Sequence, residues 1–124
     1  MQLIDTRADF PESSAVVYRG LTFQAELTGI PAGGNEPVPG GAGAELREIF
    51  RQLDGHLSGL GSDRTDVVSV KLYLQNLERD LDEVSRVYAE YFGQHRPSRG
   101  IYGVNLQPGL LVEASFVATV PEYE

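Results

Sequence analysis

The chain has 124 residues, a length typical of one domain with its own core, and we expect residues 1–124 to form a single domain. Its formal net charge of −8 disfavours general binding to nucleic acids, because like charges repel the phosphate backbone. The chain has no cysteine, which excludes disulfides and thiolate chemistry, and it has no apolar run long enough to cross a bilayer.

Residues 1–13 are mixed and polar and are expected to lead into the first strand. They lack the basic and apolar regions of a signal peptide, which makes the cytoplasm the expected location. Two short apolar runs, residues 15–18 and 21–27, flank Arg19 and Gly20 and predict a β-hairpin. Residues 29–43 are rich in glycine and proline, which is typical of a long surface loop, and they match no phosphate-binding glycine motif.

Residues 44–60 are predicted to form an amphipathic helix. Its apolar side chains recur at three- and four-residue steps, namely Leu46, Ile49, Phe50, Leu53, Leu57 and Leu60. A turn over residues 62–66 leads to a strand over residues 67–75. Strict alternation predicts that one face of this strand carries Val68, Val70, Leu72 and Leu74, and that the other carries Val67, Ser69, Lys71 and Tyr73.

A second helix is predicted over roughly residues 81–93, with a buried stripe of Leu81, Val84, Tyr88, Tyr91 and Phe92. Residues 97–113 are then interpreted as a hairpin, in which a turn over residues 107–109 joins two strands. In the last strand, alternation predicts one apolar face made of Leu110, Val112, Ala114, Phe116, Ala118 and Val120. Glu113 belongs to the other face of that strand.

The predicted order is strand, strand, loop, helix, strand, helix, strand, strand. Two helices packed on one face of a mixed sheet is the most economical α+β architecture for this order. The opposite face is not polar enough to be fully hydrated, so we expect the protein to associate with itself through that face.

Four segments of the later part of the chain resemble a known family, and they cover residues 67–74, 83–92, 97–99 and 106–113. They are similar to a strand, a helix, a P-[AS]-R motif and an L-P-x-G-x-x-V-E motif of the Rid (YjgF, reactive-intermediate deaminase) family. The resemblance extends over most of the chain, from Ala15 to Val120, and its most specific motifs lie in the C-terminal half.

The resemblance implies a chorismate-mutase-like fold, with a six-stranded mixed sheet and two helices on one face. It also implies a homotrimer with active clefts between neighbouring subunits. The best-known activity of the family is the hydrolysis of 2-imino or enamine acids to 2-keto acids with release of ammonia, without a metal or another cofactor. A small carboxylate is therefore the expected partner, whereas nucleic acid and membrane are not expected.

Two charged residues match functional residues of the family. Arg99 matches the arginine that binds the substrate carboxylate, and a guanidinium suits this role because it can donate two parallel hydrogen bonds. Glu113 matches the acidic residue that orients the attacking water, where a carboxylate can accept a proton. Tyr18 is a further candidate for substrate binding.

Several positions differ from the family pattern. Ser85 replaces an asparagine of the helix, and Ile101 stands where deaminases often have cysteine. The glycine that offers its backbone to the substrate corresponds to Glu26 in one alignment and to Gly29 in an alignment shifted along the chain. In the first alignment, Glu26 could enter the cleft and pair with Arg99. The tyrosine that many deaminases carry before the first strand is missing from residues 10–13.

These differences leave other functions open beside imine or enamine deaminase. The chain could act on another enamine-type intermediate, such as a ring-derived enamine or an aminoacrylate. It could also bind a small carboxylate without turnover, because related proteins often keep a fold and lose its activity. A ribonuclease is a fourth reading attached to this family, but the acidic charge and the lack of a basic groove argue against it.

Overall fold

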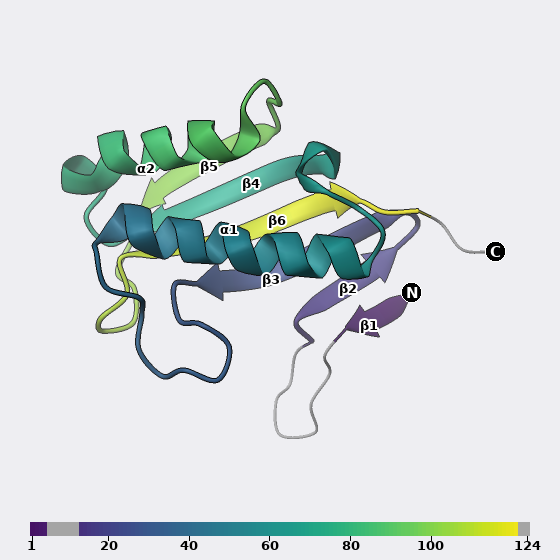
Figure 1. Ribbon diagram of the computed structural model, residues 1–124, viewed down its shortest axis with the longest axis horizontal. Helices are drawn as coiled ribbons and strands as arrows, with labels where there is room; N and C mark the ends of the chain where they lie inside the picture. Colours follow the sequence, from purple (N-terminus) through teal and green to yellow (C-terminus); the bar gives the residue numbers. More distant parts are fainter. Residues whose placement is uncertain (5–12, 122–124) are drawn as a thin grey trace.

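The computed structural model describes residues 1–4 and 13–121, which form one six-stranded β-sheet and two α-helices (Figure 1). The strands are β1 (Gln2–Ile4), β2 (Ala15–Tyr18), β3 (Leu21–Thr28), β4 (Val67–Leu74), β5 (Ser98–Gly103) and β6 (Val112–Thr119). The helices are α1 (Ala42–Gly59) and α2 (Leu77–Phe92), and a short 3-10 helix spans Arg64–Asp66.

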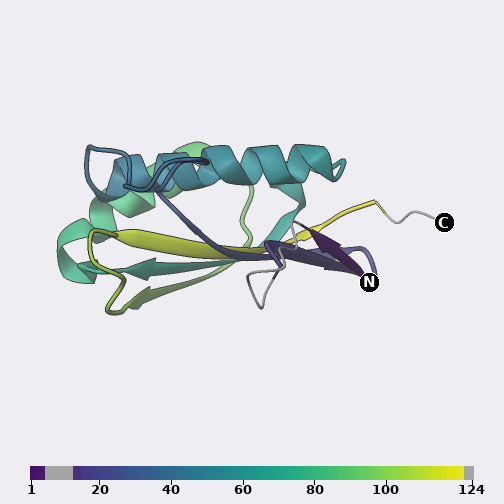
Figure 2. The ribbon, with the colours of Figure 1, turned by 90° about the horizontal axis from the view of Figure 1, so that it is seen from below.

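The strands are arranged across the sheet in the order β1-β2-β3-β6-β4-β5. Strands β4 and β5 are parallel and the other neighbouring pairs are antiparallel, so the sheet is mixed. Both helices lie on the same side of the sheet, which is clearest in the edge-on view of Figure 2. The predicted α+β fold, with two helices on one face of a six-stranded mixed sheet, is therefore confirmed. We call the two sides the helix-covered face and the open face.

The core lies between the helices and the helix-covered face. Helix α1 contributes five of the six stripe residues expected from its sequence, since Leu46, Ile49, Phe50, Leu53 and Leu57 are buried. The sixth, Leu60, follows the end of the helix and is only partly buried. Strand β6 is the central contributor from the sheet, because it pairs with both β3 and β4. Its predicted alternation is confirmed, since the buried residues are Leu110, Val112, Ala114, Phe116, Ala118 and Val120.

Strand β4 departs from the predicted alternation at its start. Val67 is fully buried, whereas 43% of Val68 is exposed, the reverse of the expectation. The reason is a β-bulge, since the register with β6 shifts between Val67 and Ser69 and one residue is left without a direct partner. After the bulge, Val70, Leu72 and Leu74 face the core as predicted.

Helix α2 begins four residues earlier than predicted, at Leu77, and the acidic residues Glu78 and Asp80 occupy its first turn. Negative side chains are favourable there because the first amide groups of a helix point outward unpaired. The prediction that Leu81 belongs to the buried stripe is wrong, since 37% of it is exposed. The inward positions are taken by Asp80, Val84, Val87, Tyr88 and Phe92.

The predicted hairpin of residues 97–113 is wrong, because β5 and β6 do not pair and β4 lies between them. Helix α2 carries the chain from the end of β4 back to the side where β4 begins. Strand β5 therefore runs parallel to β4, at the edge of the sheet. The expected turn does form, with a hydrogen bond from Leu110 N to Gln107 O and a positive φ at Gly109. That turn belongs to a linker that passes the end of β4.

The N-terminal region differs from the sequence prediction at its start. The expectation that residues 1–13 only lead into the first strand is wrong for Gln2–Ile4, which form β1. This strand is too short to give a periodic signal, and it pairs with β2, with Gln2 opposite Val17. The family tyrosine that this sequence lacks would lie in residues 10–13. Of these, residues 10–12 lie outside the described part of the chain. Among the described residues, no helix is long and apolar enough to span a membrane.

Candidate functional site

Arg99 lies on the edge strand β5 and extends over the helix-covered face. It is directly opposite Val70 of β4, a buried core residue, so the two side chains point to the same side. The guanidinium carbon lies 4.9 Å from the centre of the Tyr88 ring of α2, a cation–π contact. Arg99 is exposed and makes no hydrogen bond or ion pair with the described residues, so its donors are free for an anion.

Three other residues lie around Arg99 at the junction of α2 and β5. Tyr88 is 9% exposed, and its hydroxyl has no hydrogen-bond partner among the described residues. Burial raises the pKa of Tyr88, while the positive charge of Arg99 acts in the opposite direction. Ser85 lies one turn before Tyr88 on α2, and Ile101 packs partly buried against the core two residues after Arg99. The structure thus brings Arg99, Ser85 and Ile101 to one region.

The sequence predicts only a core role for Tyr88, because an aromatic residue in a helical stripe usually packs in the core. It does pack there, against Phe50 and Phe92. Its contact with Arg99 depends on β5 lying under α2. The sequence pattern carries no signal for that arrangement, because the strand next to β5 is far from it in the sequence. The predicted hairpin paired β5 with β6, whereas its neighbour is β4.

Glu113 lies on β6 and points to the open face, since its neighbours Val112 and Ala114 are buried on the other side. It is opposite Thr28 of β3 on one side and Tyr73 of β4 on the other. Glu113 is partly buried, and burial raises the pKa of its carboxyl above the usual value. The negative charge of Glu26 raises it further.

Glu26 reaches this region through an irregularity in β3. The register between β3 and β6 shifts between Gln24 and Leu27, so Ala25 and Glu26 lie opposite a single β6 residue, Ser115. Glu26 is exposed and acts electrostatically on Glu113. Within one chain, Glu26 therefore lies on the side of Glu113, whereas Arg99 extends over the other face.

Gly29 and Tyr18 lie apart from Arg99. Gly29 follows β3, and a methyl group added there would lie 2.7 Å from the Cβ atom of Glu45 on α1, so this close approach requires glycine. Its carbonyl accepts a hydrogen bond from Val38 N at 2.9 Å. Tyr18 ends β2 at the other end of the sheet from Glu113, with its ring 5.1 Å from the guanidinium carbon of Arg19.

Five of the seven predicted residues thus form two groups on opposite faces of the sheet. Arg99, Ser85 and Ile101 lie at the α2–β5 edge, and Glu113 and Glu26 lie on the open face. A single chain consequently does not bring the guanidinium of Arg99 and the carboxylate of Glu113 to the same side. Two aromatic rings lie on the open face next to Glu113. They belong to Tyr73 and Tyr102, which stack with ring centres 5.7 Å apart.

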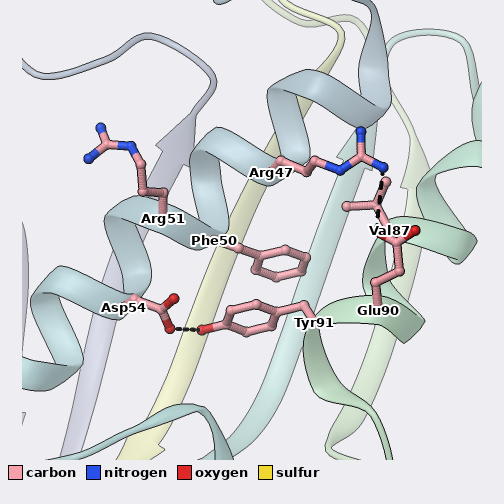
Figure 3. Close-up of a pocket in the computed structure, with 7 residues that line it drawn as sticks. All are labelled: Arg47, Phe50, Arg51, Asp54, Val87, Glu90 and Tyr91. Carbon is pink, nitrogen blue, oxygen red and sulfur yellow. Dashed lines mark hydrogen bonds and ion pairs between the residues drawn. The ribbon is translucent and has the colours of Figure 1, made fainter.

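A separate cavity of about 280 Å³ lies between α1 and α2 (Figure 3). The rings of Phe50 and Tyr91 stack 4.0 Å apart within it, and the Tyr91 hydroxyl donates to Asp54 at 2.6 Å. Burial and this hydrogen bond hold the pKa of Tyr91 above its usual value. Arg47 pairs with Glu90 at 3.4 Å. The cavity contains none of the predicted site residues, and these contacts join the two helices.

The acidic residues of the described chain do not form a metal site. Among residues 1–4 and 13–121, no three histidine, aspartate or glutamate side chains are placed so that they could hold a metal ion.

Comparisons with known proteins agree on one family. A family model described as endoribonuclease L-PSP matches residues 5–120. The 2-iminobutanoate/2-iminopropanoate deaminase of Bos taurus is 34% identical over 110 residues, which are 87% of this chain and 79% of that protein. The 3-aminoacrylate deaminase RutC of Acinetobacter baylyi is 34% identical over 82 residues, 65% of this chain and 64% of that protein. The crystal structure of the Rid-family protein YyfA from Yersinia pestis superimposes with a TM-score of 0.85 at 25% identity, covering 96% of this chain and 98% of that chain.

Proposed function

Because this chain belongs to the Rid/YjgF family, also described as endoribonuclease L-PSP, we propose that it hydrolyses small 2-imino or enamine carboxylic acids to 2-keto acids. Ammonia is the second product, and the reaction is independent of a cofactor. The observation that carries the proposal is the exposed guanidinium of Arg99, which lies over Tyr88 with no ion pair or hydrogen bond among the described residues.

In the proposed reaction, Arg99 binds the substrate carboxylate. A guanidinium can donate two parallel hydrogen bonds to a carboxylate, which sets both the position and the orientation of the substrate. The aromatic ring of Tyr88 supports the guanidinium from one side and leaves its edges accessible. Holding a reactive imine in one place next to a water molecule supplies much of the rate, since the imine carbon is already electrophilic.

Glu113 acts on the attacking water. Its carboxylate accepts a proton from the water while the water oxygen bonds to the imine carbon; the π electrons of the C=N bond move to the nitrogen, which takes a proton from solvent, and a carbinolamine forms. Glu113 then returns its proton to the amine nitrogen, the carbinolamine hydroxyl releases a proton to solvent as the carbonyl of the keto acid forms, and the carbon–nitrogen bond breaks with its electron pair leaving on ammonia. Burial raises the pKa of Glu113 above the usual carboxyl value, which makes its ionised form a better base.

The two groups act together only if a second copy of the chain contributes to the site. Arg99 and Glu113 of one chain lie on opposite faces of the sheet, so we propose that Arg99 of one subunit meets Glu113 of its neighbour in a homotrimer. The open face supports association, because it includes the exposed rings of Phe23 and Tyr102. The open face also contains a pocket of about 180 Å³ beside Phe23 and Lys71.

The test uses an amino-acid oxidase that generates the 2-imino acid in place, with semicarbazide to trap it. Wild-type protein should lower the amount of trapped imine, and Arg99→Ala should lose this effect about tenfold or more, because a hydrogen bond to a charged group contributes about 1.5–3 kcal/mol. Arg47→Ala is the matched control, since Arg47 lies in an exposed ion pair between the helices. Equal and poor quenching by wild type and Arg99→Ala would contradict the proposal.

A second function is favoured by one feature, the position of Glu26 beside Glu113. A second carboxylate there alters the charge around the reacting water, so the preferred substrate need not be the smallest imino acid. Assays of 2-iminopropanoate and 3-aminoacrylate in parallel separate the two substrate classes. Binding of small carboxylates in calorimetry, without turnover of any imine or enamine, would instead indicate a binding protein.

A further inference from the structure

Glu45 is a buried carboxyl group outside the proposed reaction. It lies in the first turn of α1, and only 3% of it is exposed. The first turn of a helix favours a negative side chain, but a buried carboxyl still requires hydrogen-bond donors. Its partners lie outside its own helix, on the strand segments that lead to Glu113.

The first partner is the backbone immediately before β6. Leu111 N donates a hydrogen bond to Oε1 of Glu45 at 2.9 Å, and Glu113 follows two residues later. The carbonyl of Leu111 accepts a hydrogen bond from Gln75 N at 3.1 Å. Leu111 is thus held from α1 on one side and from the end of β4 on the other.

The second contact of Glu45 is a packing contact, without a hydrogen bond, against the backbone that follows β3. The Cα atom of Gly29 comes so close to Glu45 that a methyl group there would lie 2.7 Å from the Cβ atom of Glu45 and 2.9 Å from its Cα atom. The preceding residue, Thr28, is directly opposite Glu113 in the sheet. Glu45 therefore contacts the residue two positions before Glu113 and the residue that follows Thr28, the cross-strand neighbour of Glu113.

We propose that Glu45 is a positioning residue for Glu113, which holds the start of β6 at the correct distance from α1 and from the end of β3. This inference rests on the proposed function, because it assumes that Glu113 handles the attacking water. A displacement of a reacting group by about 1 Å can lower a rate by about a hundredfold. Loss of the Leu111 hydrogen bond frees the segment next to Glu113, while Arg99 on β5 is unaffected.

The alternative is that Glu45 only attaches α1 to the sheet, and Glu83 provides a matched control for it. Glu83 of α2 accepts a hydrogen bond from Gly43 N at 2.8 Å, which is also a contact between a carboxylate and a backbone N–H near the start of α1. This hydrogen bond joins the two helices and does not involve β6. Glu83→Ala should therefore lower stability without changing the turnover number.

Three substitutions of Glu45 separate geometry from charge. Glu45→Gln keeps an oxygen that can accept from Leu111 N and removes the charge. Glu45→Asp keeps the charge and withdraws the acceptor by one methylene. Glu45→Met has a similar length and no acceptor for Leu111 N. Steady-state kinetics on the imine substrate give kcat and KM for each, and amide hydrogen exchange at Leu111 reports the contact directly.

A positioning role predicts that Glu45→Met lowers kcat about tenfold or more while KM stays within about twofold, since substrate binding by Arg99 is retained. Leu111 exchange should then be faster. Glu45→Gln should stay near wild type in both readouts, and Glu45→Asp should lie near the methionine variant. If the methionine variant does not fold, the comparison of Gln with Asp decides.

Two results would overturn the inference while leaving the proposed function intact. One is wild-type kcat in Glu45→Met or Glu45→Asp. The other is an equal fall of kcat in these variants and in Glu83→Ala, which would indicate general loosening of α1. If the wild-type protein itself turns over no imine or enamine, the proposed function fails instead, and the two failures are therefore distinguishable.

Discussion

At the scale of single residues, the acid–base behaviour of Glu113 depends on Glu26. Burial raises the pKa of Glu113, and the negative charge of Glu26 raises it further. Replacing Glu26 by glutamine removes the charge, so the pKa of Glu113 falls. In the proposed reaction the ionised form accepts the proton of water, so activity should be lost as the pH falls through this pKa. The acid limb of kcat/KM should therefore move to lower pH in Glu26→Gln.

The control for this prediction is Glu36→Gln, an exposed carboxylate of the loop before α1, which should leave the acid limb unchanged. Both profiles are measured with the same imine and buffer series, at constant ionic strength, because exposed charges are screened by salt. An acid limb of Glu26→Gln that coincides with wild type, or that moves to higher pH, would contradict the assigned interaction.

The hydroxyl of Tyr88 predicts an effect on stability. It is buried and has no hydrogen-bond partner among the described residues, so its desolvation is uncompensated. Tyr88→Phe removes the hydroxyl and keeps the ring under Arg99, and it should raise the free energy of unfolding by about 1 kcal/mol. Tyr88→Leu removes the ring as well, so KM for the imine should rise several-fold. Urea denaturation and steady-state kinetics measure the two effects, and lower stability of Tyr88→Phe would show that the hydroxyl has a partner in the assembled protein.

The family motifs single out Arg99 and Glu113 as candidate site residues, but they do not show on which face each side chain lies. The alternation along β6 predicts the face on which Glu113 lies, because this strand is long enough for every second residue to be recognisably apolar. The face of Arg99 depends on the register of β5 against β4, where Arg99 is opposite Val70. That register is set by partners far apart in sequence, so no local pattern contains it.

At the scale of elements, the start of α1 depends on a side chain of α2. Gly41 precedes α1 and offers no side-chain cap, and the hydrogen bond from Gly43 N to Glu83 satisfies one of the free amide groups. Glu83→Ala should lower the free energy of unfolding by about 1 kcal/mol, as loss of a helix cap does. Thermal or urea denaturation measures this, with Asp82→Ala, an exposed neighbour on α2, as the control.

The elements themselves were mostly predictable, whereas their pairing was not. Helix α1 and strand β6 have strong periodic patterns, and both lie where those patterns indicated. The β-bulge at Val68 reverses two side chains, and nothing in that valine-rich run shows where an extra residue is inserted. The expected hairpin of residues 97–113 failed for a similar reason, since a turn signal shows that the chain reverses but not which strand lies next to it.

At the scale of the whole molecule, the sheet separates the two charged residues of the proposed site. Arg99 extends over the helix-covered face at one edge, and Glu113 points to the open face from a central strand. A reaction that uses both therefore requires two copies of the chain. Size-exclusion chromatography with light scattering should show a trimer, and Phe23→Lys on the open face should weaken both the assembly and the activity.

A sharper prediction concerns mixtures of two inactive variants. Arg99→Ala retains Glu113, and Glu113→Gln retains Arg99, so each alone should be nearly inactive. When equal amounts are unfolded together and refolded, random trimers should place an intact arginine next to an intact glutamate in about a quarter of the intersubunit sites. The mixture should regain about a quarter of the activity of wild type refolded in parallel. If both groups of a site came from the same chain, the mixture would be no more active than its separate components, and the intersubunit site would be ruled out.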